Sequence, residues 1–282
     1  MNLPRFTELS RQFDLNRAAL QVRSPIEPGD VVRIVLPVSS QALADAATAA
    51  QAAYPLGQFA SVSGQQSRAY YESISLAFNP DSTTDPLHGT LGSAALTPVE
   101  HYYATPATLA KIGSLRDSYY DTYGFRLPTT AASKELALLT SKLKRSLVRS
   151  RMSVMRAGSA ATSGMYWGWH KDESVFENLR INIHVTDSPD HRIQVMREDR
   201  KPVSMDDTAL TEHRFEVGYG YSWDTHLPHR ACSVGVPKQD RTAIVLGVSP
   251  WFDYDAQADA WTPNEFFGLK HPFAMLRDGD VL

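Results

Sequence analysis

Cysteine and long apolar runs are scarce in this sequence. Cys232 is the single cysteine among 282 residues, so the chain cannot form an internal disulfide, and its composition fits a reducing compartment. No run approaches the roughly twenty apolar residues of a membrane-spanning helix. The N-terminal segment 1–6 lacks the apolar core of a secretory signal. We therefore expect a cytoplasmic protein that does not span a membrane.

The chain also lacks an excess of positive charge. Its 28 Lys and Arg residues are outnumbered by 31 Asp and Glu residues, which gives a formal net charge of -3. Proteins that bind nucleic acid carry a basic surface, so we expect none as a partner. Apolar residues make up 43% of the chain, an ordinary globular composition with ample material for a core. A small-molecule or peptide substrate is the partner we expect, and the oligomeric state is not readable.

The N-terminal region, 1–148, combines signals for helices and strands. Strands are predicted over 31–38 and 70–78, and the Ala-rich segment 41–53 predicts a helix. A second helix is predicted over 133–147, because leucines recur there at helical spacing. These leucines are Leu136, Leu139, Leu143 and Leu147. We expect the region to pack, through its helices, on a β-rich core formed by the rest of the chain.

From Arg149 onward the pattern changes to short β-rich runs between turns. Seven or eight such runs within about a hundred residues are typical of a small jelly roll or barrel. We expect 149–254 to form this core and 255–282 to lie over it, so the fold class is α+β with a mainly β core. The expected strands cover 150–155, 166–172, 179–185, 192–196, 213–217, 221–223, 231–234 and 241–248.

Two short segments about sixty residues apart carry side chains that bind metals. His170 and Asp172 are two residues apart, so in an extended strand both point to one face. A second histidine from the segment 223–229 would complete a set of two histidines and one carboxylate. This set leaves one face of the metal open and indicates a non-haem Fe(II) oxygenase. Arg241 follows, where its guanidinium could hold the far carboxylate of 2-oxoglutarate through two parallel hydrogen bonds.

Two histidines compete for the last ligand position. His226 and His229 both lie in the second segment, and we favour His229 because Pro228 precedes it and Arg241 then falls on a neighbouring antiparallel strand. His226 is then a loop histidine at the mouth of the site, where it could contact substrate. His184 is predicted to be a polar strand residue with a satisfied hydrogen bond rather than a ligand.

The same segments resemble the Fe(II)/2-oxoglutarate dioxygenases of the aspartyl/asparaginyl β-hydroxylase type. The resemblance covers roughly 149–254. It rests on the motif Trp-His-Lys-Asp at 169–172, the strand Asn-Leu-Arg-Ile-Asn-Ile at 178–183, the segment 223–229, and Arg241 at the start of an apolar strand. It implies a double-stranded β-helix with iron bound by His170, Asp172 and His229.

The resemblance also implies roles for several other residues. Arg241 would bind the distal carboxylate of 2-oxoglutarate, Asn182 would be a polar co-substrate contact, and Arg180 would face a carboxylate of substrate or co-substrate. Ser153 is a weaker co-substrate candidate. Tyr166 shares the strand face of the ligands and could line a substrate pocket. Chemistry of this kind consumes O₂ and 2-oxoglutarate, releases succinate and CO₂, and needs no catalytic acid or base beyond the metal ligands.

Two other functions fit parts of the pattern. A cupin-like metalloenzyme that does not use 2-oxoglutarate would keep the metal ligands but would need no arginine at 241. A non-catalytic β-barrel binding module would ordinarily show a damaged ligand set, and this set is complete. We therefore expect a hydroxylase acting on an unactivated C–H bond of an amino-acid-like, peptide or other carboxylate-bearing substrate.

Overall fold

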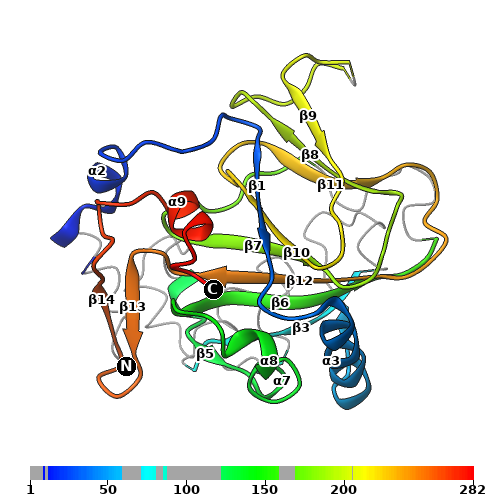
Figure 1. Ribbon diagram of the computed structural model, residues 1–282, viewed down its shortest axis with the longest axis horizontal. Coiled ribbons are helices and arrows are strands. Elements are labelled where there is room, and N and C mark those ends of the chain that lie inside the picture. Colours follow the sequence, from blue (N-terminus) through cyan, green and yellow to red (C-terminus); the bar gives the residue numbers. More distant parts are fainter. Residues whose placement is uncertain are drawn as a thin grey trace, which may run out of the picture.

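A seven-stranded antiparallel sheet runs through the middle of the molecule (Figure 1). The structure is a computed structural model, and it describes residues 9, 12–58, 71–80, 85–87, 122–158, 169–204 and 206–282. In spatial order the strands are β1 (Val31–Val35), β10 (Tyr219–Trp223), β7 (Leu179–His184), β12 (Arg241–Val248), β6 (Leu147–Met155), β3 (Tyr71–Ser75) and β2 (Gly57–Gln58).

A second, smaller sheet stands apart from the first, in the upper part of Figure 1. Its strands, in spatial order, are β11 (His229–Ser233), β8 (His191–Met196) and β9 (Leu210–His213). The isolated bridge between His170 and His229 adds a fourth row beside β11. This smaller sheet carries one of the predicted metal ligands at the first residue of β11.

The order of the strands defines a double-stranded β-helix. Along the chain, the strands pass back and forth between the two sheets, except that β8 and β9 follow one another as a pair within the small sheet. Strands β6, β7, β10 and β12 lie in the large sheet, and the His170 row, β8, β9 and β11 lie in the small one. The order β10-β7-β12-β6 faces the order β9-β8-β11-His170, which is the pairing of a jelly roll. The predicted fold class is therefore confirmed, and β1, β3 and β2 extend the large sheet at its two edges.

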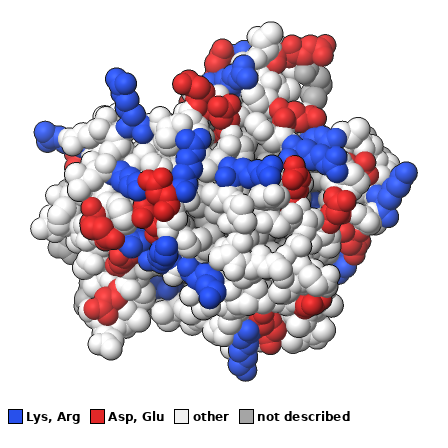
Figure 2. Space-filling model, viewed as in Figure 1, with Lys and Arg blue, Asp and Glu red and all other residues white. Residues whose placement is uncertain are grey.

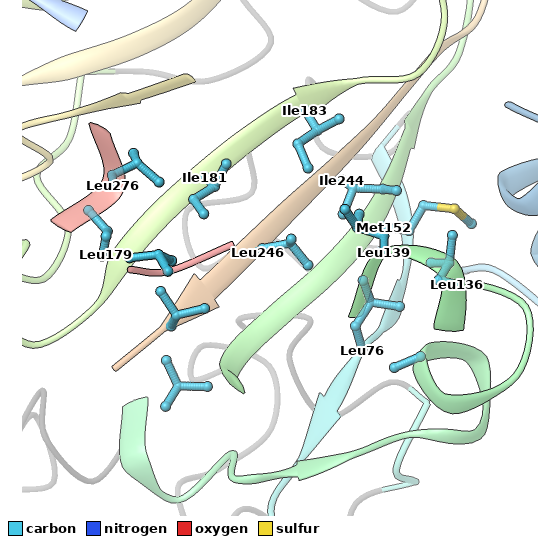
Figure 3. Close-up of a cluster of buried hydrophobic side chains, with 14 of the residues drawn as sticks. Leu76, Leu136, Leu139, Met152, Leu179, Ile181, Ile183, Ile244, Leu246 and Leu276 are labelled. Carbon is cyan, nitrogen blue, oxygen red and sulfur yellow. The ribbon is translucent and has the colours of Figure 1, made fainter. Parts of the chain in front are cut away.

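Strand β7 shows why the large sheet has two different faces. Because side chains alternate across a strand, Leu179, Ile181 and Ile183 point one way and Arg180 and His184 the other. The three aliphatic side chains have no exposed surface and belong to the main core (Figure 3). They pack there with Met152, Ile244 and Leu246 of the neighbouring strands. The polar face of β7 therefore looks into the space between the two sheets.

Helix α3 (Ser40–Ala53) forms where the Ala-rich segment predicted a helix. The Ser39 hydroxyl accepts a hydrogen bond from the Ala42 amide at 3.2 Å, a standard N-cap. Its buried residues Leu43, Ala47 and Ala50 join the main core. Small side chains let the helix approach the core closely.

The helix predicted over 133–147 is wrong. Two single turns replace it, α7 (Thr130–Ser133) and α8 (Ala137–Thr140), and β6 begins at Leu147. Leu136 and Leu139 are fully buried, so the leucine spacing did report a core-facing segment. The residues after α8 bond to distant segments and do not continue a helix. The Lys144 amide donates to the Val281 carbonyl at 2.9 Å, and Arg145 pairs with Asp253 at 3.0 Å.

One strand of the small sheet also differs from its prediction. A strand was expected over 213–217, but β9 ends at His213. Phe215 instead stacks on Tyr221 at 4.1 Å between ring centroids and belongs to a separate apolar cluster. The strand predicted over 166–172 is described only from residue 169 onward.

The C-terminal segment contributes to the same core as the large sheet. The hairpin of β13 (Phe252–Asp255) and β14 (Ala260–Pro263) is followed by helix α9 (Pro272–Arg277). Phe273 and Met275 of α9 are buried in the main core. The remaining short elements are α2 (Leu15–Ala19), β4 (Ala77–Phe78) and β5 (Leu127–Pro128).

Charged side chains of both signs are interspersed on the face of the molecule seen in Figure 2. Such a face has no extended field of one sign. Among the described residues, no helix has the length and apolar character required to cross a membrane.

Candidate metal centre

His170, Asp172 and His229 meet at one end of the space between the two sheets. One ligand atom from each residue can be chosen so that all three atoms lie within 4.8 Å of one another. The Asp172 Oδ2 atom lies 3.8 Å from His170 Nε2 and 3.4 Å from His229 Nε2. The site thus offers two imidazole nitrogens and one carboxylate oxygen. This ligand set suits a divalent transition metal.

Backbone pairing brings these distant segments together. The His170 amide donates to the His229 carbonyl at 3.1 Å, and the His229 amide donates back at 2.9 Å. The Asp172 amide donates to the Thr225 carbonyl at 2.8 Å. These main-chain bonds hold the two ligand-bearing segments side by side.

A backbone carbonyl fixes the tautomer of His229. Its Nδ1 lies 2.9 Å from the Leu227 carbonyl oxygen, and a carbonyl can only accept, so Nδ1 carries the proton. The lone pair is therefore on Nε2, the atom that faces Asp172. Metal-binding histidines are commonly oriented by a hydrogen bond of this kind.

Asp172 is held in its charged form. Burial by itself raises the pKa of this carboxyl, but the Arg180 guanidinium holds it well below its ordinary value. Arg180 contacts the Asp172 carboxylate directly. An ionised carboxylate is the form that a metal requires.

Arg180 belongs to a buried network of charges around the site. It contacts Glu173 as well as Asp172, and Arg149 Nη1 lies 3.1 Å from Glu173 Oε1. The Thr225 hydroxyl donates to the Glu173 carbonyl at 2.7 Å. Glu173 and Thr225 were not among the predicted site residues. The sequence signal for Glu173 was its position directly after Asp172. Its arginine partners could not be read from the sequence, because they lie on two other strands, β6 and β7.

Arg241 lies toward the other end of the same interior. Across the β7–β12 pair, Gly247 faces Arg180 and Ala243 faces His184, so Arg241, at the start of β12, lies at the His184 end. Four residues of strand separate Arg180 from His184, about 13 Å along β7. The Arg241 side chain is buried, with Nη2 2.8 Å from His184 Nε2 and Nη1 3.2 Å from Met155 Sδ.

Apolar side chains line the space between the metal-ligand end and Arg241. They come from β8, β10 and the segment after β9, and they are shielded from solvent. The cluster consists of Ile193, Val195, Phe215, Tyr221 and Trp223. Trp223 also meets the His229 ring edge-on, with centroids 5.6 Å apart. The part of the interior next to these side chains is therefore largely apolar.

The other predicted site residues occupy different environments. Asn182 is half-buried on the inward face of β7, between Tyr221 and Val245 in the register. Ser153 is buried in β6, opposite Ala243. His226 is exposed in the turn that precedes β11. Tyr166 lies outside the described residues.

His184 takes part in a hydrogen bond, as predicted for a polar strand residue. Its Nε2 contacts Arg241, and the side chain is 1% exposed. Burial and the nearby Arg241 charge hold its pKa well below the ordinary value, so the imidazole is neutral. What the sequence did not reveal is that its partner is Arg241.

No protein-family model matches the chain, and no curated protein matches it in sequence. Similar solved structures include the non-haem alpha ketoglutarate dependent epimerase SnoN from nogalamycin biosynthesis, at 11% identity over 84% of each chain with a TM-score of 0.40. AtDAO1, a dioxygenase for auxin oxidation from Arabidopsis thaliana in complex with 2-oxoglutarate, is 12% identical over 83% of this chain and 86% of its own, with a TM-score of 0.40. The non-haem monooxygenase ThoJ, in a nickel complex, is 14% identical over 93% of each chain, with a TM-score of 0.38. The fold assignment for the present chain rests on its own strand order rather than on these low scores.

Proposed function

We propose that this protein is an Fe(II)- and 2-oxoglutarate-dependent oxygenase. One observation carries the proposal: the cluster of His170, Asp172 and His229 shares one barrel interior with a buried arginine, Arg241. A metal site alone would suit many reactions. A metal site with a guanidinium farther along the same interior suits a co-substrate that chelates metal at one end and carries a carboxylate at the other.

The ligand set fits iron. Two imidazoles and one ionised carboxylate lie on one side of the site, a ligand set that would hold iron and leave room for co-substrate and O₂. Iron bound in this way supplies the oxidative chemistry, in which one atom of O₂ enters succinate as CO₂ is released and the other enters the substrate. The residues of this chain position the ligands and keep water out of the apolar interior.

Each remaining site residue has a proposed role. Arg241 binds the distal carboxylate of 2-oxoglutarate, with Asn182 and Ser153 as further polar contacts on the same inward faces. Arg180 is proposed to recognise a carboxylate of substrate or co-substrate, beside the protein carboxylates Asp172 and Glu173 that its two terminal nitrogens contact. The exposed His226 stands at the mouth as a substrate contact, and Tyr166 is proposed to line the pocket.

Finer aspects of the proposal rest on the sequence motifs. We propose hydroxylation of an unactivated C–H bond in an amino-acid-like, peptide or other carboxylate-bearing substrate, in the manner of the aspartyl/asparaginyl β-hydroxylase type. The catalytic unit is proposed to be 149–254, with 1–148 and 255–282 packed around it. The single cysteine, Cys232, supports a reducing, cytoplasmic setting.

Anaerobic titration of the protein with Fe(II) and 2-oxoglutarate, followed by visible absorbance, tests the proposal without a substrate. We expect a weak metal-to-ligand charge-transfer band that is absent in His170→Ala. Iron binding without the band would instead favour a cupin-like metalloenzyme. Failure to bind iron would favour a binding module.

A further inference from the structure

A buried contact joins Arg241 to His184. Arg241 Nη2 lies 2.8 Å from His184 Nε2, and their side chains come from the neighbouring strands β12 and β7. Arg241 is 6% exposed and His184 is 1% exposed. Hydrogen bonds that involve a charged group and are shielded from water are among the stronger polar contacts in a protein.

The direction of this hydrogen bond follows from the chemistry of the two groups. A guanidinium has N–H donors only and stays protonated, so His184 Nε2 must accept. The proton of the imidazole is then on Nδ1, and the ring is neutral. Rings of His191 and Phe215 pack against it, with centroids 4.9 Å and 5.3 Å away. These contacts restrict the ring, so the acceptor atom is held in a fixed place.

The contact of Arg241 with Met155 is weaker. Met155 Sδ lies 3.2 Å from Nη1, and a thioether is a weak acceptor. The two contacts engage different terminal nitrogens of the fork. His184 therefore supplies the stronger of these two contacts and orients the plane of the guanidinium.

We propose that His184 is a positioning residue for Arg241, which holds the guanidinium in the orientation that selects a dicarboxylate co-substrate. This inference rests on the proposed function, because it assumes that Arg241 binds the distal carboxylate. An arginine fork recognises a carboxylate through two parallel hydrogen bonds, so its affinity depends on orientation as well as charge. A guanidinium that is already oriented loses less freedom when the ligand binds.

The test compares two 2-oxo acids that differ only at their far end. 2-Oxoglutarate carries a distal carboxylate, whereas 2-oxopentanoate has a methyl group in its place and chelates a metal through the same atoms. Dissociation constants for both are measured by absorbance on the anaerobic Fe(II)-loaded protein. For His184→Leu we expect 2-oxoglutarate to bind about ten- to hundredfold more weakly. The affinity for 2-oxopentanoate and for Fe(II) should change by less than about twofold.

Two further variants separate positioning from packing. His184→Gln keeps an acceptor near the place of Nε2 and is expected to recover most of the lost preference for 2-oxoglutarate. His213→Leu is the matched control: this histidine lies in β9 of the small sheet, 2.9 Å from the Gly29 carbonyl oxygen. It should leave the preference unchanged. Thermal unfolding of each variant establishes that it is folded.

The possible failures are distinguishable. If the wild-type protein binds the two acids equally well, Arg241 does not recognise a distal carboxylate, and both the proposed function and this inference are overturned. If the wild-type protein prefers 2-oxoglutarate and His184→Leu keeps that preference, the inference alone is overturned. Equal weakening of both acids in His184→Leu would indicate a general disturbance of the barrel and would also overturn it.

Discussion

Single residues decide the charge state of the metal centre. Of the three candidate ligands, Asp172 is the one that offers a negative charge, and Arg180 keeps it ionised. His229 has its ligand nitrogen selected by the Leu227 carbonyl. At this scale, a change of one side chain should remove one specific property of the site while leaving the barrel intact.

The choice between the two histidines of 223–229 can be tested directly. His229→Ala removes an imidazole whose Nε2 lies 3.4 Å from Asp172, so we expect loss of Fe(II) binding. His226→Ala removes an exposed side chain and should leave Fe(II) binding largely intact. Equilibrium dialysis under anaerobic conditions measures both. The opposite result would exchange the two histidines in the ligand set.

Arg241 offers a prediction in which co-substrate and metal are affected differently. Arg241→Ala removes the guanidinium that is proposed to bind the distal carboxylate, so the concentration of 2-oxoglutarate needed for half-saturation should rise at least tenfold. The Fe(II) requirement should stay nearly constant, because Arg241 lies at the His184 end of the interior and not among the ligands. Titration of each in turn checks this, and equal effects on both would contradict the assignment.

Individual elements place these residues through alternation and pairing. β7 directs its leucine and isoleucines to the main core and Arg180, Asn182 and His184 to the interior. β12 lies between β7 and β6 and carries Arg241 at its first residue. A slip of one residue in the β7 register would exchange these faces, so the core and the site are specified together.

Protonation of His271, the N-cap residue of helix α9, should lower the stability of the fold. Burial lowers the pKa of His271 to about 4, whereas an unfolded histidine titrates near 6.5. Its Nδ1 accepts a hydrogen bond from the Phe273 amide at 3.2 Å, as the N-cap of α9. The unfolded chain therefore binds the proton more readily, and stability falls as the pH drops below about 6.5.

His271→Asn tests this effect because asparagine is a good N-cap that does not titrate. Between pH 7 and pH 5 the wild-type protein should lose roughly 2 kcal/mol more free energy of unfolding than the variant. Urea denaturation at the two pH values measures the difference. His226→Asn, at an exposed position, should keep the wild-type dependence on pH. An unchanged pH dependence in His271→Asn would contradict the role of this helix cap.

At the scale of the whole molecule, the metal site joins segments that are far apart in the chain. His170 and His229 belong to paired rows of the small sheet, and Asp172 bonds to Thr225 through its amide. A metal held by all three would therefore bind the folded chain and not the unfolded one. By mass action such a ligand stabilises the folded state.

Addition of Mn(II) or anaerobic Fe(II) should accordingly raise the unfolding temperature. A metal concentration one hundred times the dissociation constant adds about 2.7 kcal/mol, which corresponds to roughly 5–10 °C for a chain of this size. Differential scanning calorimetry with and without metal measures the shift. His229→Ala serves as the control and should show none. A similar rise in that variant would mean that the metal binds elsewhere.

The sequence by itself determined the features that depend on local spacing. The two-residue separation of His170 and Asp172 predicted that both point to one side, and the alternation in β7 separates core from interior. The strand-rich pattern after Arg149 predicted the β core. Each of these follows from the period of a strand, which near neighbours in the chain establish.

Only the tertiary structure decided which distant groups meet. It placed His229 beside Asp172 and left His226 exposed, engaged Arg180 with Glu173, and paired Arg241 with His184. It also replaced the helix expected over 133–147 by two short turns and the start of β6. Sequence periodicity reports how a segment faces the core. The partners of a buried charge depend on strand order and register, which are fixed by contacts between residues far apart in the chain.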